Sequence, residues 1–290
     1  MYTQRPAEFT YHRPTSLDEA LSLLGGNEDA RVLAGGHSLL PLMKVRLATP
    51  AALIDLGGIP GLGEIAEEGD NLVIGAFATH ASVATSELVR RRCPVLAEAA
   101  GVIGDRQVRN RGTIGGSLAH ADPGADYPTV VSALGATIAT AGANGGRQLA
   151  ADEFFRGVFT TALEPGEVIT AVTVPATPAG TGAAYMKHAH PASGYAVAGA
   201  AAVVSLESGR CTGARVTIGG VADRPVDAAA AAEALVGSAP SDDAIAAAAA
   251  KVADALTGTI DDTYASAEYR VHLATVLARR ALAEAFVRAG

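Results

Sequence analysis

The chain has 290 residues, with 22 basic and 30 acidic side chains, so its formal net charge at pH 7 is −8. This length favours more than one folding unit. The negative charge and the lack of any extended run of Lys or Arg exclude nucleic acid as the expected partner, because binding to a phosphate backbone depends on basic side chains. With 63 alanines and 33 glycines, the 49% apolar fraction overstates the core, and Leu, Val and Ile must fill the interior between small residues.

The sequence carries no signal that would place it across a membrane. No stretch approaches the roughly 18 consecutive apolar residues of a membrane helix, and the first residues lack the apolar centre of a signal peptide. We therefore expect a cytoplasmic protein. Its two cysteines, Cys93 and Cys211, lie far apart without a CxxC pattern. They cannot by themselves hold an iron–sulfur cluster, which normally requires more cysteine ligands than these.

The first predicted elements form a small βαβ-like unit. Thr15 and Ser16 offer capping oxygens for a helix of about ten residues, Glu19 completes the capping pattern, and Gly25-Gly26 ends the helix. Two short apolar strands and a Gly/Pro-rich boundary follow, at 31–34, 52–55 and 57–61.

The middle of the chain mixes strands and helices. Thr79 and Ser86 are expected to cap helices, because their hydroxyls can accept hydrogen bonds from the first free N–H groups. The stretch 175–182 is too poor in branched side chains for either kind of element and is interpreted as a linker. The predicted strands lie at 72–75, 137–141 and 168–174.

The last third predicts a three-stranded sheet followed by a helical bundle, an order that indicates an α+β fold. In the final helix, one stripe is expected to carry the apolar side chains Tyr269, Leu273, Val276 and Leu277. The predicted strands are 183–187, 196–206 and 215–219, and the helices are 228–235, 244–256 and 266–288.

Two glycine pairs carry the functional signal. Ala34-Gly35-Gly36-His37-Ser38 and Thr113-Ile114-Gly115-Gly116-Ser117 each place a hydroxyl residue just after the pair. Paired glycines let the main chain turn with positive φ and let N–H groups converge on an anion without obstruction by Cβ. Two such segments suit a ligand with two bridged phosphates.

The spacing of these glycines excludes two common nucleotide motifs. There is neither a G-x-G-x-x-G turn nor a G-x-x-x-x-G-K-[ST] loop, so a Rossmann dinucleotide site and a P-loop are not indicated. Glycine pairs also occur in ordinary turns. The remaining pairs are interpreted in that way: Gly25-Gly26, Gly57-Gly58, Gly145-Gly146 and Gly219-Gly220.

The residues around the two pairs resemble the FAD-binding medium subunit of the molybdenum hydroxylases, the xanthine dehydrogenase family. The resemblance rests on Gly35–Pro41, Thr113–Pro123, Glu164–Ile169 and Ala265–Arg270, and is strongest to the aerobic carbon monoxide dehydrogenases. It implies an α+β fold with a two-part FAD-binding domain of the vanillyl-alcohol-oxidase/PCMH type and a C-terminal flavoprotein domain. The expected ranges are 1–57 and 58–176 for the two FAD-binding subdomains and 177–290 for the C-terminal domain.

By this resemblance the two glycine segments bind the FAD pyrophosphate from two sides. One wall would be formed by Ala34, Gly35, Gly36, His37, Ser38 and Leu39, and the other by Thr113, Gly115, Gly116 and Ser117. Asp126 matches a carboxylate that hydrogen-bonds the adenosine ribose. It could equally be an acidic residue placed at the positive end of a helix.

Three more residues match positions near the cofactor in this family: Leu163, Lys187 and Tyr195. A Lys beside a flavin can stabilise the anionic reduced form by its charge. The Tyr195 ring would stack on the isoalloxazine. The alternatives are a solvated Lys187 and a core Tyr195 with a satisfied hydroxyl.

Several other polar residues are given structural roles. His188-x-His190 has a spacing found in metal sites but lacks a third ligand nearby, so no metal is expected. His120 and Asp122 are explained as loop structure within the second motif. Cys93, after three arginines, could be a thiol of low pKa, but a small buried residue is preferred. No catalytic residue is assigned to this chain.

The resemblance implies an oxidoreductase subunit that carries electrons, while the substrate is oxidised elsewhere. Molybdopterin and [2Fe-2S] clusters are expected on a large and a small partner subunit, in a dimer of heterotrimers, with a quinone or another acceptor taking electrons from FAD. The complex would be cytoplasmic or lie at the inner face of the membrane.

Three alternatives stay open at this point. The first is a stand-alone FAD-dependent oxidoreductase of the same fold. The second is the medium subunit of a hydroxylase for xanthine, another heterocycle or an aldehyde, because Ser117 and the segment 188–193 depart from the patterns expected of carbon monoxide enzymes. The third is a flavin-binding scaffold without electron transfer.

Overall fold

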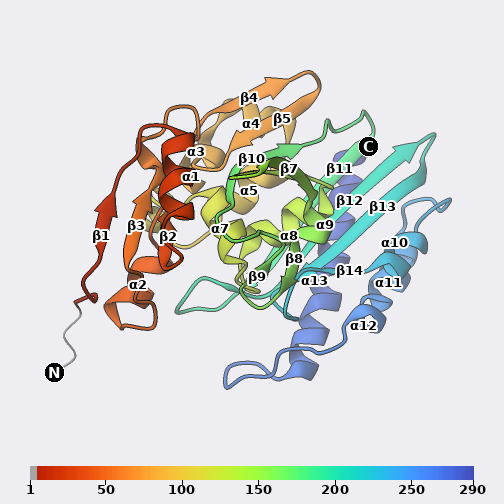
Figure 1. The fold of residues 1–290 in the computed structure, drawn as a ribbon. Coiled ribbons are helices and arrows are strands. Elements are labelled where there is room, and N and C mark those ends of the chain that lie inside the picture. Colours follow the sequence, from red (N-terminus) through yellow and green to blue (C-terminus); the bar gives the residue numbers. More distant parts are fainter. Residues whose placement is uncertain (1–4) are drawn as a thin grey trace.

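The computed structural model describes residues 5–290, so the first four residues of the segment searched for a signal peptide lie outside it. The N-terminal part is a parallel sheet of strand order β1-β3-β2 with two helices, drawn in red and orange in Figure 1. The sequence predicted α1, β2 and β3 but not β1 or α2, which are too short to show a period. The bounds are β1 (Thr10–His12), α1 (Leu17–Gly25), β2 (Ala30–Leu33), α2 (Leu39–Lys44), β3 (Ala52–Asp55) and the 3₁₀ turn η1 (Leu56–Gly58).

Side-chain caps start three of the helices as predicted. The N–H of Glu19 donates to Ser16 Oγ at 3.2 Å, and the Glu19 carboxylate accepts from the N–H of Thr15 at 2.9 Å. Thr79 and Ser86 accept hydrogen bonds from the helices that follow them, at 3.0 and 3.3 Å. These local contacts confirm the three predicted helix starts, because a cap is encoded within a few residues.

The middle part contains a five-stranded antiparallel sheet of order β4-β5-β10-β6-β7. The predicted strands correspond to β5 (Asn71–Gly75), β6 (Thr137–Gly142) and β10 (Val168–Val174); β4 (Ile65–Glu68) and β7 (Gly145–Ala150) were not predicted. A separate pair joins β8 (Phe155–Gly157) and β9 (Thr160–Thr161). The helices are α3 (His80–Thr85), α4 (Glu87–Arg92), α5 (Pro94–Gly101), α6 (Arg106–Arg109), α7 (Ile114–His120), α8 (Asp126–Ala133) and α9 (Ala151–Phe154).

The C-terminal part is a four-stranded sheet of order β11-β12-β13-β14, so the prediction of three strands was wrong. The fourth strand has only two residues, too few for a sequence period, and pairs Val226 with Ile218. The strand β11 also begins inside the predicted linker, and the predicted helix 244–256 is interrupted at Lys251. The bounds are β11 (Thr181–Ala189), β12 (Ala196–Glu207), β13 (Arg210–Gly219), β14 (Val226–Asp227), α10 (Ala229–Glu233), α11 (Asp242–Ala250), α12 (Val252–Ala255) and α13 (Ala267–Ala289).

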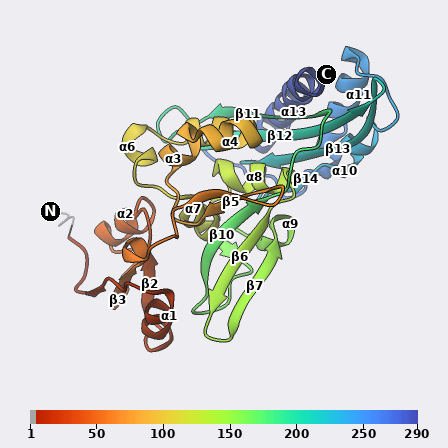
Figure 2. The ribbon, with the colours of Figure 1, turned by 90° about the horizontal axis from the view of Figure 1, so that it is seen from above.

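Helices lie on both faces of this sheet, α13 on one and α8 on the other (Figure 2), and small residues of the strands let them approach. On β12, Ala198, Ala200 and Ala202 face α13, whereas Ala201 faces the core that contains α8. A Cβ at Gly182 would overlap the backbone of α13, and one at Gly219 would overlap the Thr129 hydroxyl of α8. The high Ala and Gly content therefore reflects close packing of helices on the sheet.

The buried face of α13 overlaps the predicted stripe in part. Leu277 is buried as predicted and Leu273 packs against the core, but Tyr269 is 44% exposed and Arg270 and the alanines of this face are buried instead. Arg270 is only 5% exposed because its guanidinium donates to the carbonyls of Val197 at 2.6 Å and Gly220 at 2.9 Å and pairs with Asp262. Apolar periodicity cannot identify a face that carries a buried arginine and alanines.

Among residues 5–290, no helix combines the length and apolarity that crossing a bilayer requires.

We expect Arg270→Met to lower the free energy of unfolding by about 3 kcal/mol, because two buried carbonyls lose their donors. Chemical denaturation of the full chain measures this loss. The control is Arg280→Met, which changes an exposed arginine of the same helix and should cost less than about 0.5 kcal/mol. Equal effects of the two substitutions would contradict a structural role for Arg270.

Candidate cofactor site

A cavity of about 570 Å³ lies where the three parts of the chain meet. This volume falls within the range of about 300–1,000 Å³ that is usual for cofactor pockets. Its walls are the loop after β2, the segments from the end of β5 to α7, the turn before β10 and the loop between β11 and β12. All predicted site residues except Lys187 line it: Ala34, Gly35, Gly36, His37, Ser38, Leu39, Thr113, Gly115, Gly116, Ser117, Asp126, Leu163 and Tyr195.

The loop that contains the first glycine pair packs against the backbone just before the second pair. A Cβ at Gly35 would overlap the carbonyl oxygen of Arg111 and lie 2.6 Å from the Cα of Gly112. A Cβ at Gly116 would lie 3.5 Å from the Cβ of Ala34. The loop after β2 lies directly against the start of α7. Only glycine allows this approach at position 35, because any Cβ would overlap the facing backbone. The two segments therefore border one cavity from adjacent sides.

The loop after β2 leaves its N–H groups free. Gly36 adopts φ +77°, which turns the chain toward α2. The N–H groups of residues 35–38 make no hydrogen bond to any other part of residues 5–290. Consecutive N–H groups in such a loop form a concave set of donors that suits an anion. Gly36 thus has the positive φ that the sequence allowed, and binding of an anion by these N–H groups stays a prediction.

The second glycine pair already uses its N–H groups within the protein. Gly115 N donates to the carbonyl of Ala76 at 2.8 Å, Gly116 N to Thr113 Oγ1 at 3.1 Å and Ser117 N to the carbonyl of Thr113 at 3.0 Å. The prediction that these N–H groups converge on an anion is therefore wrong. Here the glycines bring α7 close to the end of β5, since a Cβ at Gly115 would lie 2.5 Å from the Cβ of Ala76. The polar side chain that this pair brings to the cavity is that of Ser117, on the first turn of α7.

Asp126 is the first residue of α8 and is held from the C-terminal part. Its Oδ1 accepts from the Tyr185 hydroxyl at 2.7 Å, and its Oδ2 accepts from Lys187 Nζ at 2.9 Å. Burial raises the pKa of the Asp126 carboxyl, and the two donors oppose that rise. Lys187 also donates to the Val102 carbonyl at 3.3 Å and is almost fully buried, so the solvated alternative is wrong. Lys187 does not line the cavity, and its charge is balanced by Asp126, which does.

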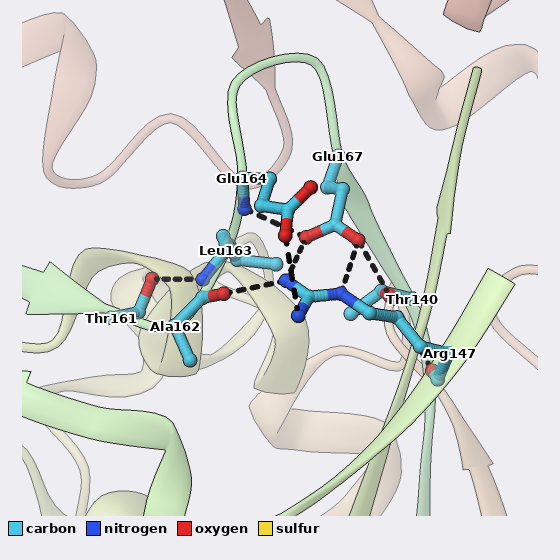
Figure 3. Close-up of polar contacts among 7 residues, drawn as sticks. All are labelled: Thr140, Arg147, Thr161, Ala162, Leu163, Glu164 and Glu167. Atoms are coloured by element: carbon cyan, nitrogen blue, oxygen red, sulfur yellow. Dashed lines mark hydrogen bonds and ion pairs between the residues drawn. The ribbon is translucent and has the colours of Figure 1, made fainter. Parts of the chain in front are cut away.

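Leu163 lies at the start of the turn that precedes β10, and Figure 3 shows the polar contacts around it. Arg147 on β7 pairs with Glu167 at the end of this turn, with Nη2 to Oε2 at 2.6 Å. Leu163, Gly166 and Glu167 line the cavity, whereas Arg147 does not. The hydrogen bond from Arg147 lowers the pKa of the Glu167 carboxyl. The sequence pointed to Leu163 but missed the ion pair behind it, because a β-strand arginine gives no local sign of its partner.

Tyr195 lies in the loop between β11 and β12, where it is 42% exposed, so the alternative of a core tyrosine is wrong. This loop is shaped by His190, whose Nδ1 accepts from the N–H groups of Ala192 at 3.2 Å and Ser193 at 3.3 Å. The ring of His190 also packs against that of Tyr264 in a tilted arrangement, with ring centroids 4.3 Å apart. Within residues 5–290, no cluster of three or more potential metal ligands occurs.

His80 is a cavity residue that the sequence did not single out. It is 5% exposed, its ring lies 5.3 Å from that of Tyr127, and its Nδ1 has no hydrogen-bond partner within residues 5–290. Burial lowers the pKa of His80 to about 4, so the ring is neutral at pH 7. Nothing in a lone histidine after a helix cap distinguishes it from a surface residue.

Cys93 is a buried residue at the start of α5, as the preferred interpretation held. It is 2% exposed, and burial raises the pKa of its thiol to about 11. The alternative of a reactive thiol of low pKa is therefore wrong. His120 lies in the cavity wall, where its ring faces that of Phe159, with the centroids 4.9 Å apart.

Comparisons with known proteins match nearly the whole length of the chain. Residues 7–177 match the FAD binding domain in molybdopterin dehydrogenase, and residues 183–285 match the CO dehydrogenase flavoprotein C-terminal domain. The carbon monoxide dehydrogenase medium chain of Afipia carboxidovorans is 43% identical, with 98% of this chain and 99% of that protein covered. The nicotine 6-hydroxylase medium subunit of Paenarthrobacter nicotinovorans is 38% identical, with 96% and 97% covered.

Solved structures give the same result. A chain of carbon monoxide dehydrogenase from Hydrogenophaga pseudoflava superposes with a TM-score of 0.94 and 44% identity, covering 98% of this chain and 99% of that chain. A chain of quinoline 2-oxidoreductase from Pseudomonas putida 86 superposes with a TM-score of 0.94 and 36% identity, with the same coverage. The α+β fold predicted from the sequence is confirmed.

The buried His80 should make stability fall on acidification. Its pKa is about 4 in the folded chain and about 6.5 when unfolded, so below pH 6.5 the unfolded chain binds a proton that the folded chain does not. His80 therefore costs no stability above pH 6.5 and should account for a loss of about 2 kcal/mol between pH 7 and pH 5. Urea denaturation of the wild type and of His80→Gln at both pH values measures this difference. Parallel losses in the two proteins would disprove the linkage.

Proposed function

The chain belongs to the FAD-binding medium subunits of the molybdopterin dehydrogenases, and from this premise we propose that it passes electrons through FAD inside a multi-subunit oxidoreductase. The observation that carries the proposal is the free N–H groups of residues 35–38 at the wall of a cavity of about 570 Å³. Unpaired backbone donors in a concave loop are what a pyrophosphate requires.

The residues present fit an anionic dinucleotide. The loop of residues 35–38 donates to phosphate oxygens, and Ser117, at the positive end of α7, contributes a hydroxyl from the other side. Two acidic residues of the lining, Asp126 and Glu167, are paired with cations that lie behind them. The cavity therefore does not repel a negatively charged ligand as strongly as its acidic residues alone would.

The remaining predicted residues bind FAD through the shape of the cavity and through direct contacts. Leu163 forms an apolar wall, and the ring of Tyr195 offers a flat face to the isoalloxazine. Asp126 bonds the adenosine ribose with lone pairs that Tyr185 and Lys187 leave available. Lys187 acts through Asp126 and keeps that carboxylate charged and oriented. Lys187 does not line the cavity and makes no direct contact with the flavin.

FAD supplies a carrier that accepts electrons singly and releases them in pairs. The electrons come from [2Fe-2S] clusters on a small partner subunit and leave to a quinone or another acceptor, while a large molybdopterin subunit oxidises the substrate. The two cysteines of this chain, both buried and apart, do not provide such clusters. The complex is a cytoplasmic dimer of heterotrimers in this proposal.

The substrate proposed for the complex is carbon monoxide, with another hydroxylase substrate as the second candidate. The resemblance to carbon monoxide dehydrogenase medium chains is the support for the first. Relatives named for nicotine and for caffeine, at 38% and 32% identity, are the support for the second. The three domain ranges 1–57, 58–176 and 177–290 remain proposals as well.

Gly36→Val and Gly116→Val should each weaken FAD binding by about tenfold or more, the first because it disturbs the free N–H groups of residues 35–38 and the second because it displaces Ser117 on the first turn of α7. At Gly36 the side chain forces a residue with φ +77° into strain, and at Gly116 the Cβ lies 2.8 Å from the capping oxygen of Thr113. FAD per chain after purification measures the loss. The control Gly213→Val adds a side chain in open space on β13 and should keep its FAD. Full FAD content in both test variants would contradict the assignment.

Purification of the native complex tests the electron-transfer role. We expect FAD on this chain and molybdenum and iron on copurifying subunits, measured by absorption spectra, metal analysis and peptide identification. A lone chain that oxidises a substrate with oxygen, without molybdenum or iron, would instead support the stand-alone oxidoreductase. Bound flavin that never passes electrons to an acceptor would support the scaffold.

A further inference from the structure

The backbone on both sides of Leu163 is held by one ion pair (Figure 3). Arg147 Nη2 donates to the carbonyl of Ala162, just before Leu163, at 2.6 Å. The N–H of Glu164, just after Leu163, donates to Glu167 Oε2 at 2.7 Å. The N–H of Leu163 itself donates to Thr161 Oγ1 at 3.2 Å. The peptide groups around this cavity residue are therefore fixed by side chains.

The chain between Leu163 and β10 is a tight turn. The N–H of Glu167 donates to the carbonyl of Glu164 at 3.0 Å, and Gly166 adopts φ +80°. Pro165 before a glycine of positive φ is the pattern of a type II turn. This turn folds Glu167 back under Glu164, so that one carboxylate reaches both the turn and the arginine.

The pair between Arg147 and Glu167 is bidentate, and its carboxylate is shielded from solvent. Nε lies 2.7 Å from Oε1 and Nη2 lies 2.6 Å from Oε2, while the Glu167 side chain is only 8% exposed. Thr140 also donates to Oε1 at 3.3 Å. Hydrogen bonding raises the pKa of Arg147 and lowers that of Glu167, so both groups are charged at neutral pH. A planar guanidinium can bond a carboxylate and a carbonyl at once, which an ammonium group cannot do with the same geometry.

We propose that Arg147 is a positioning residue for the cofactor: through Glu167 and the Ala162 carbonyl it fixes how far the Leu163 side chain reaches into the cavity against bound flavin. Arg147 does not line the cavity itself, so it acts on the cofactor through two residues that do: Leu163, whose backbone it holds, and Glu167, whose charge it balances. This inference rests on the proposed function, since it requires FAD in the cavity.

The test compares Arg147→Met with a matched control in the complex as purified from its host. Arg92→Met is the control, because Arg92 also pairs with a carboxylate, Glu67 at 2.9 Å, and with a carbonyl, that of Asp70 at 2.9 Å. The two arginine side chains are similarly exposed, at 36% and 34%, but Arg92 is not at the cavity. We expect about tenfold faster release of FAD from Arg147→Met, followed by flavin fluorescence, and an altered visible circular dichroism of the bound flavin. The control should match the wild type in both measurements.

Two further variants separate positioning from general stability. Arg147→Lys keeps the charge without the planar fork and should release FAD at a rate between those of the wild type and Arg147→Met. Leu163→Ala should release FAD faster by itself, and adding Arg147→Met to it should change the rate by less than about twofold, because both act on the same contact. Thermal unfolding of each variant shows whether the fold is retained.

The wild-type complex tests the proposed FAD function, and the variants test the positioning role of Arg147. If the wild-type complex contains no FAD, the proposed function fails. If the wild type holds FAD but Arg147→Met releases it no faster than Arg92→Met, the positioning role is overturned while the proposed function stands. Additive effects of Arg147→Met and Leu163→Ala would also overturn it, because Arg147 would then act independently of Leu163.

Discussion

The close approach of the loop after β2 to the start of α7 is the constraint on which the cavity depends. Gly35 rests on the backbone of Arg111 and Gly112, and no side chain can stand between them. Because this contact joins the small parallel sheet to the middle part, it sets the distance between two walls of the site. The N–H groups of residues 35–38 stay free at this junction. Those of Gly115 and Gly116 donate hydrogen bonds within the protein that hold α7 in place. One glycine pair thus offers donors to a ligand, and the other builds the support.

Electrostatics follow a common arrangement on two other walls of the cavity. Asp126 and Glu167 face the cavity, and their cationic partners Lys187 and Arg147 lie behind them. Each carboxylate is therefore charged, oriented and balanced without presenting its cation to the ligand. Both pairs also join segments far apart in the chain: Lys187 on β11 reaches α8, and Arg147 on β7 reaches the turn before β10. The same ion pairs that balance the charge of the cavity wall also hold these distant segments together.

The packing of the C-terminal part explains the composition of the chain. Alanines of β12 and Gly182 of β11 let α13 lie directly on the sheet, and this closeness makes Arg270 reach the carbonyls of Val197 and Gly220. Sequence periodicity located α13 and its buried Leu277 but placed Tyr269 on the buried face in place of Arg270, because Tyr269 is the more apolar of the two. The two-residue β14 was missed for a different reason, since its existence depends only on pairing with β13.

The sequence by itself determined the features that are encoded within a few neighbouring residues. These are the helix caps at Ser16, Thr79 and Ser86, the main strands, the paired glycines and the motifs from which the family was inferred. The tertiary structure alone decided which N–H groups of the glycine pairs remain free, that Arg270 and not Tyr269 is buried on α13, and which cations balance Asp126 and Glu167. These depend on contacts between distant segments: whether an N–H group is free is set by the carbonyl that folding brings beside it, as Ala76 is brought beside Gly115.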